Sequence, residues 1–164
     1  MFITHRRRKQ LTERIRRFFG GLPCRVQVAA LPWRRAENGE FEVLLVTSRG
    51  TGRWVVPKGW PEKRERPYEA AAREAAEEAG VSGAISSSGL GCFYYSKVLP
   101  SGMEWRCEVH VYPMEVDTVA EKWPERKKRT RRWFAPQDAA ELVAEPDLAE
   151  LIAGFGVNPR KYAA

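Results

Sequence analysis

The 164-residue sequence has few cysteines and no hydrophobic run long enough to cross a membrane. Its three cysteines, Cys24, Cys92 and Cys107, are widely spaced and form no C-x-x-C pair. A disulfide framework or a zinc site is therefore not expected, and a reducing cytoplasm is the predicted compartment. No apolar segment approaches the roughly 20 residues of a membrane-spanning helix, so no membrane partner is expected. No apolar stretch with a cleavage site follows the basic N-terminus, which argues against a secretory signal.

The composition is typical of one globular domain with an excess of positive charge. Hydrophobic residues make up 43% of the chain, which is enough to form a core. Lys and Arg number 28 against 21 Asp and Glu, and this excess favours anionic partners such as nucleic acid, acidic lipid or polyphosphate. No internal repeat or long linker is present. We expect a basic N-terminal extension at residues 1–20, one domain at residues 21–158, and a tail at residues 159–164.

Hydrophobic periodicity and turn residues predict an α/β fold with a mixed sheet. Residues 6–19 could form a basic helix that covers the domain, touches an acidic partner or frays; Leu11, Ile15, Phe18 and Phe19 would lie on one side of it. A loop is expected from Lys58 to Arg66. The expected strands are 24–33, 41–47, 54–56, 90–98, 103–116 and 133–134, and the expected helices are 67–79, 136–143 and 146–155.

The helix expected at 67–79 carries a cluster of acids. Glu74, Glu77 and Glu78 follow the spacing i, i+3 and i+4, so they share one face of the helix. Carboxylates this close repel one another, and they suit a hard cation such as Mg²⁺, which prefers oxygen ligands. We expect this acidic face to be exposed. The opposite, buried face is expected to carry the alanines Ala71, Ala72, Ala75, Ala76 and Ala79.

The loop before this helix completes a longer motif. The segment GWPEKRERPYEAAAREAAEEAGV, from Gly59 to Val81, fills every fixed position of the pattern G-x5-E-x7-R-E-U-x-E-E-x-G-U, in which U is apolar. Only Ala75 is small for its position. A strand that ends in Trp-x-x-Pro (Trp54 to Pro57) precedes the motif. The chain therefore resembles the Nudix hydrolase family over roughly residues 24–155.

The resemblance implies an α/β/α sandwich around a mixed β-sheet and a metal-dependent hydrolase with Mg²⁺ or Mn²⁺ as cofactor. The enzyme would cleave a phosphoanhydride bond by attack of water. Glu77 and Glu78 would bind the metal, and Glu74 would bind the metal or activate the water. The backbone carbonyl of Lys58 or Gly59 would complete the coordination.

The resemblance also implies supporting roles around the metal site. Arg73 would orient a glutamate, and Glu65 would support the loop through a salt bridge. Some family members take the general base from outside the motif. Four glutamates are available here for that role: Glu104, Glu108, Glu115 and Glu121.

Within the family, the chain looks most similar to diphosphoinositol polyphosphate and dinucleoside polyphosphate phosphohydrolases. The runs Leu44–Gly59 and Glu121–Phe134 carry this resemblance, and residues 126–132 form a strongly basic segment that suits a highly phosphorylated ligand. The expected partner is thus a small-molecule polyphosphate. The candidate substrate contacts are Arg25, Ser48, Arg49, Lys58, Lys97 and Arg129.

Two alternatives remain open. The enzyme could act on another nucleotide, such as ADP-ribose, a nucleoside triphosphate or an RNA 5′ triphosphate. Alternatively, the chain could be an RNA-binding module that uses segments 6–17 and 126–132, with Trp105, Trp123 and Trp133 stacking on bases. An RNA-binding module needs no carboxylate cluster, so the intact motif favours the enzyme. No particular oligomeric state is predicted.

Overall fold

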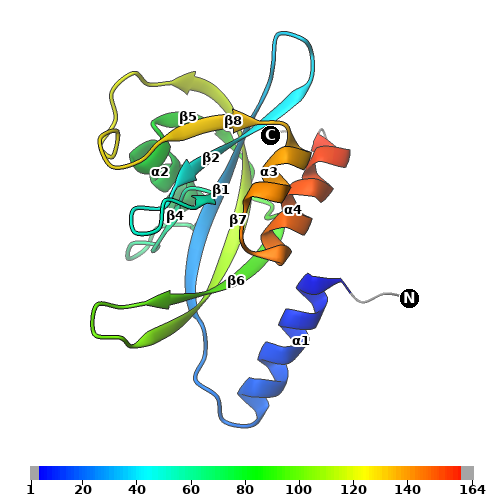
Figure 1. Ribbon diagram of the computed structural model, residues 1–164, viewed down its shortest axis with the longest axis vertical. Helices are drawn as coiled ribbons and strands as arrows, with labels where there is room; N and C mark the ends of the chain where they lie inside the picture. The colour runs from blue at the N-terminus through cyan, green and yellow to red at the C-terminus, as the bar shows by residue number, and fades with distance from the viewer. Residues whose placement is uncertain (1–3, 160–164) are drawn as a thin grey trace.

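The computed structural model describes residues 4–159, which form a mixed β-sheet with helices on both faces (Figure 1). Residues 1–3 of the predicted extension and residues 160–164 of the predicted tail lie outside this range. No helix of the described part is long and apolar enough to cross a membrane. The elements in chain order are α1 (His5–Phe18), β1 (Arg25–Arg35), β2 (Phe41–Thr47), β3 (Trp54–Val55), β4 (Lys58–Gly59), α2 (Pro67–Ala79), β5 (Val81–Ile85), β6 (Gly91–Val98), β7 (Glu104–Val119), β8 (Arg131–Phe134), α3 (Pro136–Leu142) and α4 (Pro146–Val157).

Two long strands, β1 and β7, organise the sheet. They pair in parallel with each other, whereas β1 pairs antiparallel with β2 and β4. Strand β7 also pairs antiparallel with β5 and β6, and β8 pairs with β2. The main strand order is β3-β2-β1-β7-β5. The predicted mixed sheet is confirmed.

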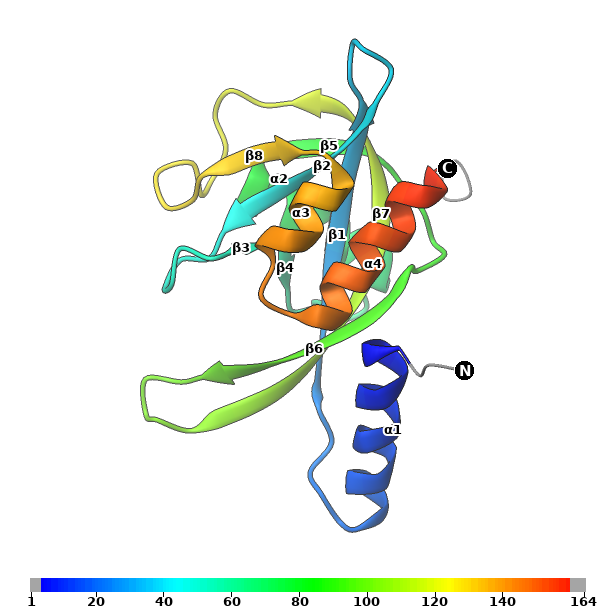
Figure 2. The same ribbon diagram turned by 45° about the vertical axis from the view of Figure 1, so that its right-hand side comes forward.

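Helices cover both faces of this sheet. Helix α2 packs against β1 on one face, while α3 and α4 lie side by side on the other (Figure 2). On the α2 side the contact is made by Ala70, Ala71, Ala75 and Ala79, all fully buried. Small side chains allow the helix backbone to lie close to the strands. The predicted α/β/α sandwich is therefore confirmed.

Helix α2 begins and ends where the sequence predicts, because a proline starts it and a glycine ends it, and a distant arginine binds its last carbonyls. Pro67 occupies the first turn, where its missing N–H costs no hydrogen bond. Gly80 ends the helix in the left-handed region at φ 62°, a conformation that glycine adopts without strain. Beyond it, the guanidinium of Arg131 donates to the carbonyls of Ala79 and Gly80.

Two short strands were not expected from the sequence. Lys58 and Gly59, assigned to a loop, pair with β1 as β4, and residues 81–85 form β5 at the edge of the sheet. Ser82 and Gly83 have little β propensity. Gly83 lies at an irregularity in the register, where an added Cβ would overlap the backbone of Glu115. Long-range pairing, not local preference, makes β5 a strand.

The N-terminal helix forms as expected but packs differently from an ordinary surface helix. Helix α1 lies beyond the end of the sheet, next to β6 and the start of α4 (Figure 1). Its apolar residues Leu11, Ile15 and Phe18 are exposed, as is Phe19, which follows the helix. The helix is held to the domain by polar residues instead.

Candidate active site

Three of the acidic residues of α2 face a cavity with a volume of about 810 Å³. Glu74, Glu77 and Glu78 line it on one side. Other parts of the wall come from the β2–β3 loop, β4 and β6. The cationic residues of the lining are Arg49, Arg53, Lys58, Arg73, Lys97 and Arg129.

Glu74 is buried against β4, which corrects the expectation of an exposed acidic face. Its carboxylate lies where a Cβ on Gly59 would be, so a larger residue at that position of the motif would displace the carboxylate. Burial raises the pKa of Glu74, and the nearby negative charges of Glu77 and Glu125 act in the same direction. The Arg73 guanidinium, 2.8 Å from Glu74 Oε1, opposes this rise.

Glu78 is also buried, with a side chain only 9% exposed. The backbone N–H of Lys58 donates to its Oε2 at 3.1 Å, and Arg129 forms an ion pair with its Oε1. Burial nevertheless dominates and raises the pKa of Glu78 to about 7, although Arg129 and Lys58 lower it. Of the three acids, only Glu77 has a substantially exposed side chain, at 47%.

The alanine face of α2 differs from the expected one at three positions, and Ala72 is only half-buried. Ala70 is buried, whereas Ala76 is exposed. The helix is rotated so that Glu74 and Glu78 turn partly toward β4. The acidic residues therefore lie at the boundary between the core and the cavity.

Arg73 ties the loop of the motif to the helix. Its guanidinium pairs with both carboxylate oxygens of Glu65 at 3.0 Å and donates to the carbonyl of Trp60 at 3.1 Å. It also lies 3.5 Å from Glu77 Oε1. The prediction that Glu65 supports the loop through a salt bridge is confirmed, and the contact lowers the pKa of Glu65.

Lys58 is placed between the acids and an aromatic ring. Its Nζ lies 4.8 Å from the ring centre of Tyr95. Burial lowers the pKa of Lys58, and the positive charges of Arg129 and Lys97 lower it further, whereas Glu78 opposes the shift. Because its ammonium group is already largely removed from water, it can bind an anion in the cavity with little further cost of desolvation.

Arg129 links the basic segment to the acids of α2. Its guanidinium pairs with Glu78 and Glu125 and donates to the carbonyl of Thr47 at 2.9 Å. Glu125 also lies 3.5 Å from Arg49. Arg129 is thus a positive charge held directly between two carboxylates at the cavity wall.

Most predicted substrate contacts line the cavity, namely Ser48, Arg49, Lys58, Lys97 and Arg129. Arg25 does not; its guanidinium lies 3.2 Å from the ring centre of Trp105. None of the four glutamates considered as a general base outside the motif lines the cavity. The glutamates that do so are Glu62, Glu74, Glu77, Glu78, Glu125 and Glu145.

Sequence reasoning missed several lining residues. Glu125 carries a local signal, because it lies four residues before Arg129 and pairs with it. Trp60 directly follows Gly59 in the motif, whereas Tyr95 and Glu145 carry no local signal, since only the fold brings their segments to the cavity.

The donor chemistry of the α2 acids fits a divalent cation. Glu74, Glu77 and Glu78 offer carboxylate oxygens, which Mg²⁺ and Mn²⁺ prefer. Within residues 4–159, no group of three or more His, Cys, Asp and Glu side chains is arranged to hold a metal ion. Arg73 and Arg129 pair with oxygens of Glu74 and Glu78.

The three tryptophans considered for base stacking all have partners within the protein. The guanidinium of Arg25 stacks on the ring of Trp105, and the guanidinium carbon of Arg34 lies 4.2 Å from the ring centre of Trp133. The Trp123 indole N–H donates to the carbonyl of Glu78. Their placement gives no support to an RNA-stacking surface.

Comparison with known proteins decides the family. The NUDIX domain model matches residues 25–155. The chain belongs to the Nudix family. Its motif from Gly59 to Val81 is thus a Nudix box, and the resemblance seen in the sequence is confirmed.

Named relatives and solved structures are similar to this Nudix chain. Nudix hydrolase 12, mitochondrial, from Arabidopsis thaliana is 39% identical over 106 residues, which span 63% of this chain and 52% of that protein. Diphosphoinositol polyphosphate phosphohydrolase 2 from Rattus norvegicus is 37% identical over 107 residues, spanning 63% and 55%. The chain therefore spans about half the length of these two relatives. The cytoplasmic location stays a prediction.

The fold is also found in a solved structure. A binary complex of the C. elegans Ap4A hydrolase superposes with a TM-score of 0.63 at 19% identity, covering 84% of this chain and 98% of that chain. At this identity the likeness supports the Nudix fold alone.

Proposed function

We propose that this Nudix chain hydrolyses a phosphoanhydride bond in a small, highly phosphorylated molecule and depends on Mg²⁺ or Mn²⁺. One observation carries the proposal: the acids of α2 face a cavity whose other walls are rich in cations. Carboxylates suit a metal, and Lys and Arg side chains suit phosphate groups. Their presence in one cavity matches the needs of phosphoanhydride cleavage.

Glu74, Glu77 and Glu78 would hold the cation, with the carbonyl of Lys58 or Gly59 as a further donor. A bound divalent cation lowers the pKa of coordinated water and offsets negative charge on phosphate oxygens. Because Arg73 contacts Glu74 and Glu77 and Arg129 contacts Glu78, cation binding requires these ion pairs to loosen.

Glu74 would accept a proton from the attacking water, because both oxygens of Glu78 already have partners in the Lys58 N–H and Arg129. Its pKa is raised by burial, and a carboxylate with a raised pKa is a stronger base. Arg73 holds one oxygen of Glu74 at 2.8 Å, which fixes the direction of the other. Arg73 is accordingly a positioning residue.

The cationic lining favours a polyphosphate substrate. Arg49, Lys58, Lys97 and Arg129 would contact its phosphates, and loss of the Arg129 pair with Glu78 would free that guanidinium for the substrate. A cavity of about 810 Å³ is large enough for a small-molecule ligand. The named activity of the rat relative agrees with a diphosphoinositol polyphosphate, and a dinucleoside polyphosphate has the same phosphate chemistry.

A substrate panel with Mg²⁺, with Mn²⁺ and with a chelator tests this function. It contains a diphosphoinositol polyphosphate, a dinucleoside polyphosphate, ADP-ribose, a nucleoside triphosphate and triphosphorylated RNA, and phosphate or nucleotide release is measured. We expect the diphosphoinositol polyphosphate and the dinucleoside polyphosphate to be cleaved fastest, and we expect no cleavage when the chelator removes the metal. Faster cleavage of one of the other three would reject the proposed substrate class.

Matched variants test the site itself. Glu78→Gln should lower kcat at least about a hundredfold, a loss of about 3 kcal/mol of transition-state stabilisation. Glu69→Gln is the control, because Glu69 lies on the same helix but outside the cavity lining. Full activity of the Glu78→Gln protein would reject the assignment of the metal site.

A further inference from the structure

Helix α1 presents its polar side to the protein and its apolar side to solvent. Lys9, Glu13 and Arg16 have the spacing i, i+4 and i+7 and face the domain. The exposed residues Leu11, Ile15 and Phe18 have the same spacing on the opposite side. An ordinary surface helix has the reverse orientation.

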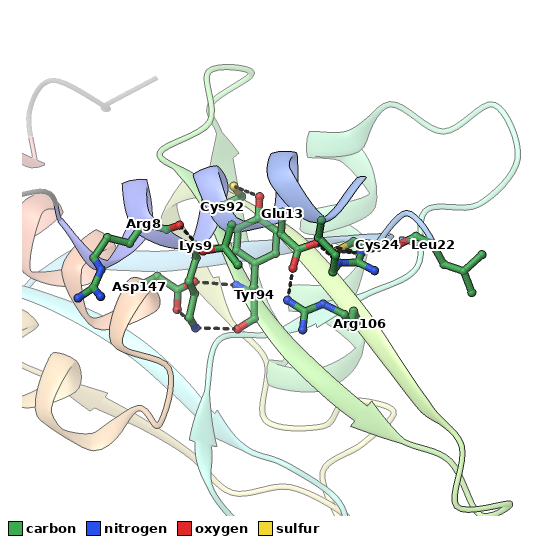
Figure 3. Close-up of polar contacts among 11 residues, drawn as sticks. Arg8, Lys9, Glu13, Leu22, Cys24, Cys92, Tyr94, Arg106 and Asp147 are labelled. Carbon is green, nitrogen blue, oxygen red and sulfur yellow. Dashed lines mark hydrogen bonds and ion pairs between the residues drawn. The ribbon is translucent and has the colours of Figure 1, made fainter. Parts of the chain in front are cut away.

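The first anchor of α1 is an ion pair with a buried acid. The Asp147 side chain is fully buried, and Lys9 Nζ lies 3.1 Å from its Oδ1 (Figure 3). Lys9 also donates to the carbonyl of Tyr94, whose N–H donates to Asp147 Oδ2 at 2.9 Å. A buried carboxylate without a partner is costly, so Lys9 fixes the side of α1 that faces the domain.

The second anchor is Glu13, which is also buried. Its carboxylate pairs with Arg106 from β7 and with Arg16 of the same helix, and it accepts a hydrogen bond from the Cys24 thiol (Figure 3). With both anchors formed, rotation of α1 to bury its apolar side would leave Glu13 and Asp147 without these partners.

The exposed side of α1 carries several apolar residues, and the rings of Phe18 and Phe19 contact each other edge to face. Phe18 is 86% and Phe19 is 80% exposed, and Leu22, which follows the helix in the chain, is 82% exposed. Aromatic and aliphatic side chains so exposed indicate a partner. The exposed basic residues of the helix are Arg7, Arg8, Arg14 and Arg17.

We propose that this face of α1 binds an anionic lipid surface, lying in the plane of the interface. Apolar side chains would enter the boundary between headgroups and acyl chains, while arginines contact lipid phosphates. Charge complementarity favours a lipid surface over a second copy of this chain, because a dimer through this face would bring two basic helices together and their positive charges would repel. Nucleic acid would leave Leu11 and Ile15 without an apolar environment.

The sequence predicted no membrane partner because it contains no membrane-spanning run, and a lipid-bound α1 departs from that prediction. A 14-residue helix is about 21 Å long, too short to span a bilayer. It can lie on the surface, and such binding depends on exposure of the apolar side rather than on a long apolar run. The contacts of Lys9 and Glu13 with the domain, which the sequence does not show, are what turn the apolar side of α1 toward solvent.

Vesicle sedimentation with the full chain tests the proposal. Vesicles of phosphatidylcholine alone are compared with vesicles of phosphatidylcholine and phosphatidylserine, at low and high salt. We expect binding roughly a hundredfold tighter to the anionic vesicles, weakened by salt. No preference for the anionic vesicles would overturn the proposal.

Three variants separate the apolar and charged contributions. The Phe18→Ser/Phe19→Ser protein should bind at least roughly tenfold more weakly, and the Arg7→Gln/Arg14→Gln protein should lose the preference for anionic lipid. Val157→Ser, which changes another exposed apolar residue, should bind like the original protein. Urea unfolding checks that all three remain folded.

Light scattering distinguishes the competing occupant. The proposal expects the same mass in solution for the original and the Phe18→Ser/Phe19→Ser proteins. A dimer that this variant dissociates, or vesicle binding that it leaves unchanged, would overturn the lipid assignment. Neither result bears on phosphoanhydride hydrolysis, so failure here is distinguishable from failure of the proposed function.

Discussion

Substitution of Glu78 by Gln is expected to stabilise the metal-free protein at neutral pH while strongly lowering its activity. Glu78 is buried beside Lys58 and Arg129, yet its pKa is raised to about 7 from an ordinary value of 4.5. The cost of removing the carboxylate from water thus exceeds the stabilisation by the two cations. Gln has nearly the same shape without the charge.

The pKa sets both the magnitude and the pH range of this effect. Each pH unit by which folding raises the pKa corresponds to about 1.4 kcal/mol, so the ionised Glu78 costs about 3 kcal/mol. Between about pH 4.5 and pH 7 the folded state holds more protons than the unfolded state, so its stability falls as the pH rises. The Glu78→Gln protein should lack this fall.

Urea unfolding in the presence of a chelator, from about pH 4 to about pH 8, measures the difference. The two proteins should be nearly equal at the acid end, and Glu78→Gln should be about 3 kcal/mol more stable above about pH 7. Glu77→Gln serves as a control: its side chain is half exposed, and it should change stability by less than about 0.5 kcal/mol. A Glu78→Gln protein less stable than the original at about pH 8 would refute the reasoning.

Three further substitutions test individual contacts. Gly59→Ala should displace the Glu74 carboxylate and lower kcat at least about tenfold, measured in the preferred substrate assay; unchanged kcat would show that the close contact is unimportant. Arg129→Gln should strengthen Mn²⁺ binding in calorimetric titration, because it removes the cation that pairs with Glu78, and should raise KM; weaker Mn²⁺ binding would contradict this. Lys97→Gln should raise KM several-fold with little change in kcat, and a fall in kcat alone would argue against a phosphate contact.

Much of the architecture could be predicted because its signals are local. The limits of α2 follow from Pro67 and Gly80, whose backbone preferences act within a few residues. Strand β5 could not be predicted, because Ser82 and Gly83 are poor strand formers and pair only once β7 is beside them. The same distinction holds for the candidate site. The salt bridge of Arg73 with Glu65 joins residues close in the chain and could be predicted, whereas the burial of Glu74 depends on the distant pairing of β4 with β1 and could not.

The sequence by itself determined the Nudix box, the shared face of Glu74, Glu77 and Glu78, and the family. Helical periodicity and motif spacing are properties of neighbouring residues, so they require no knowledge of the fold. Tertiary structure alone decided that β4 buries two of these acids, that Arg129 reaches Glu78 from 51 residues away, and that the polar side of α1 faces inward. Burial and ion pairing depend on segments distant in the chain, and these contacts set the pKa values and the exposed surface.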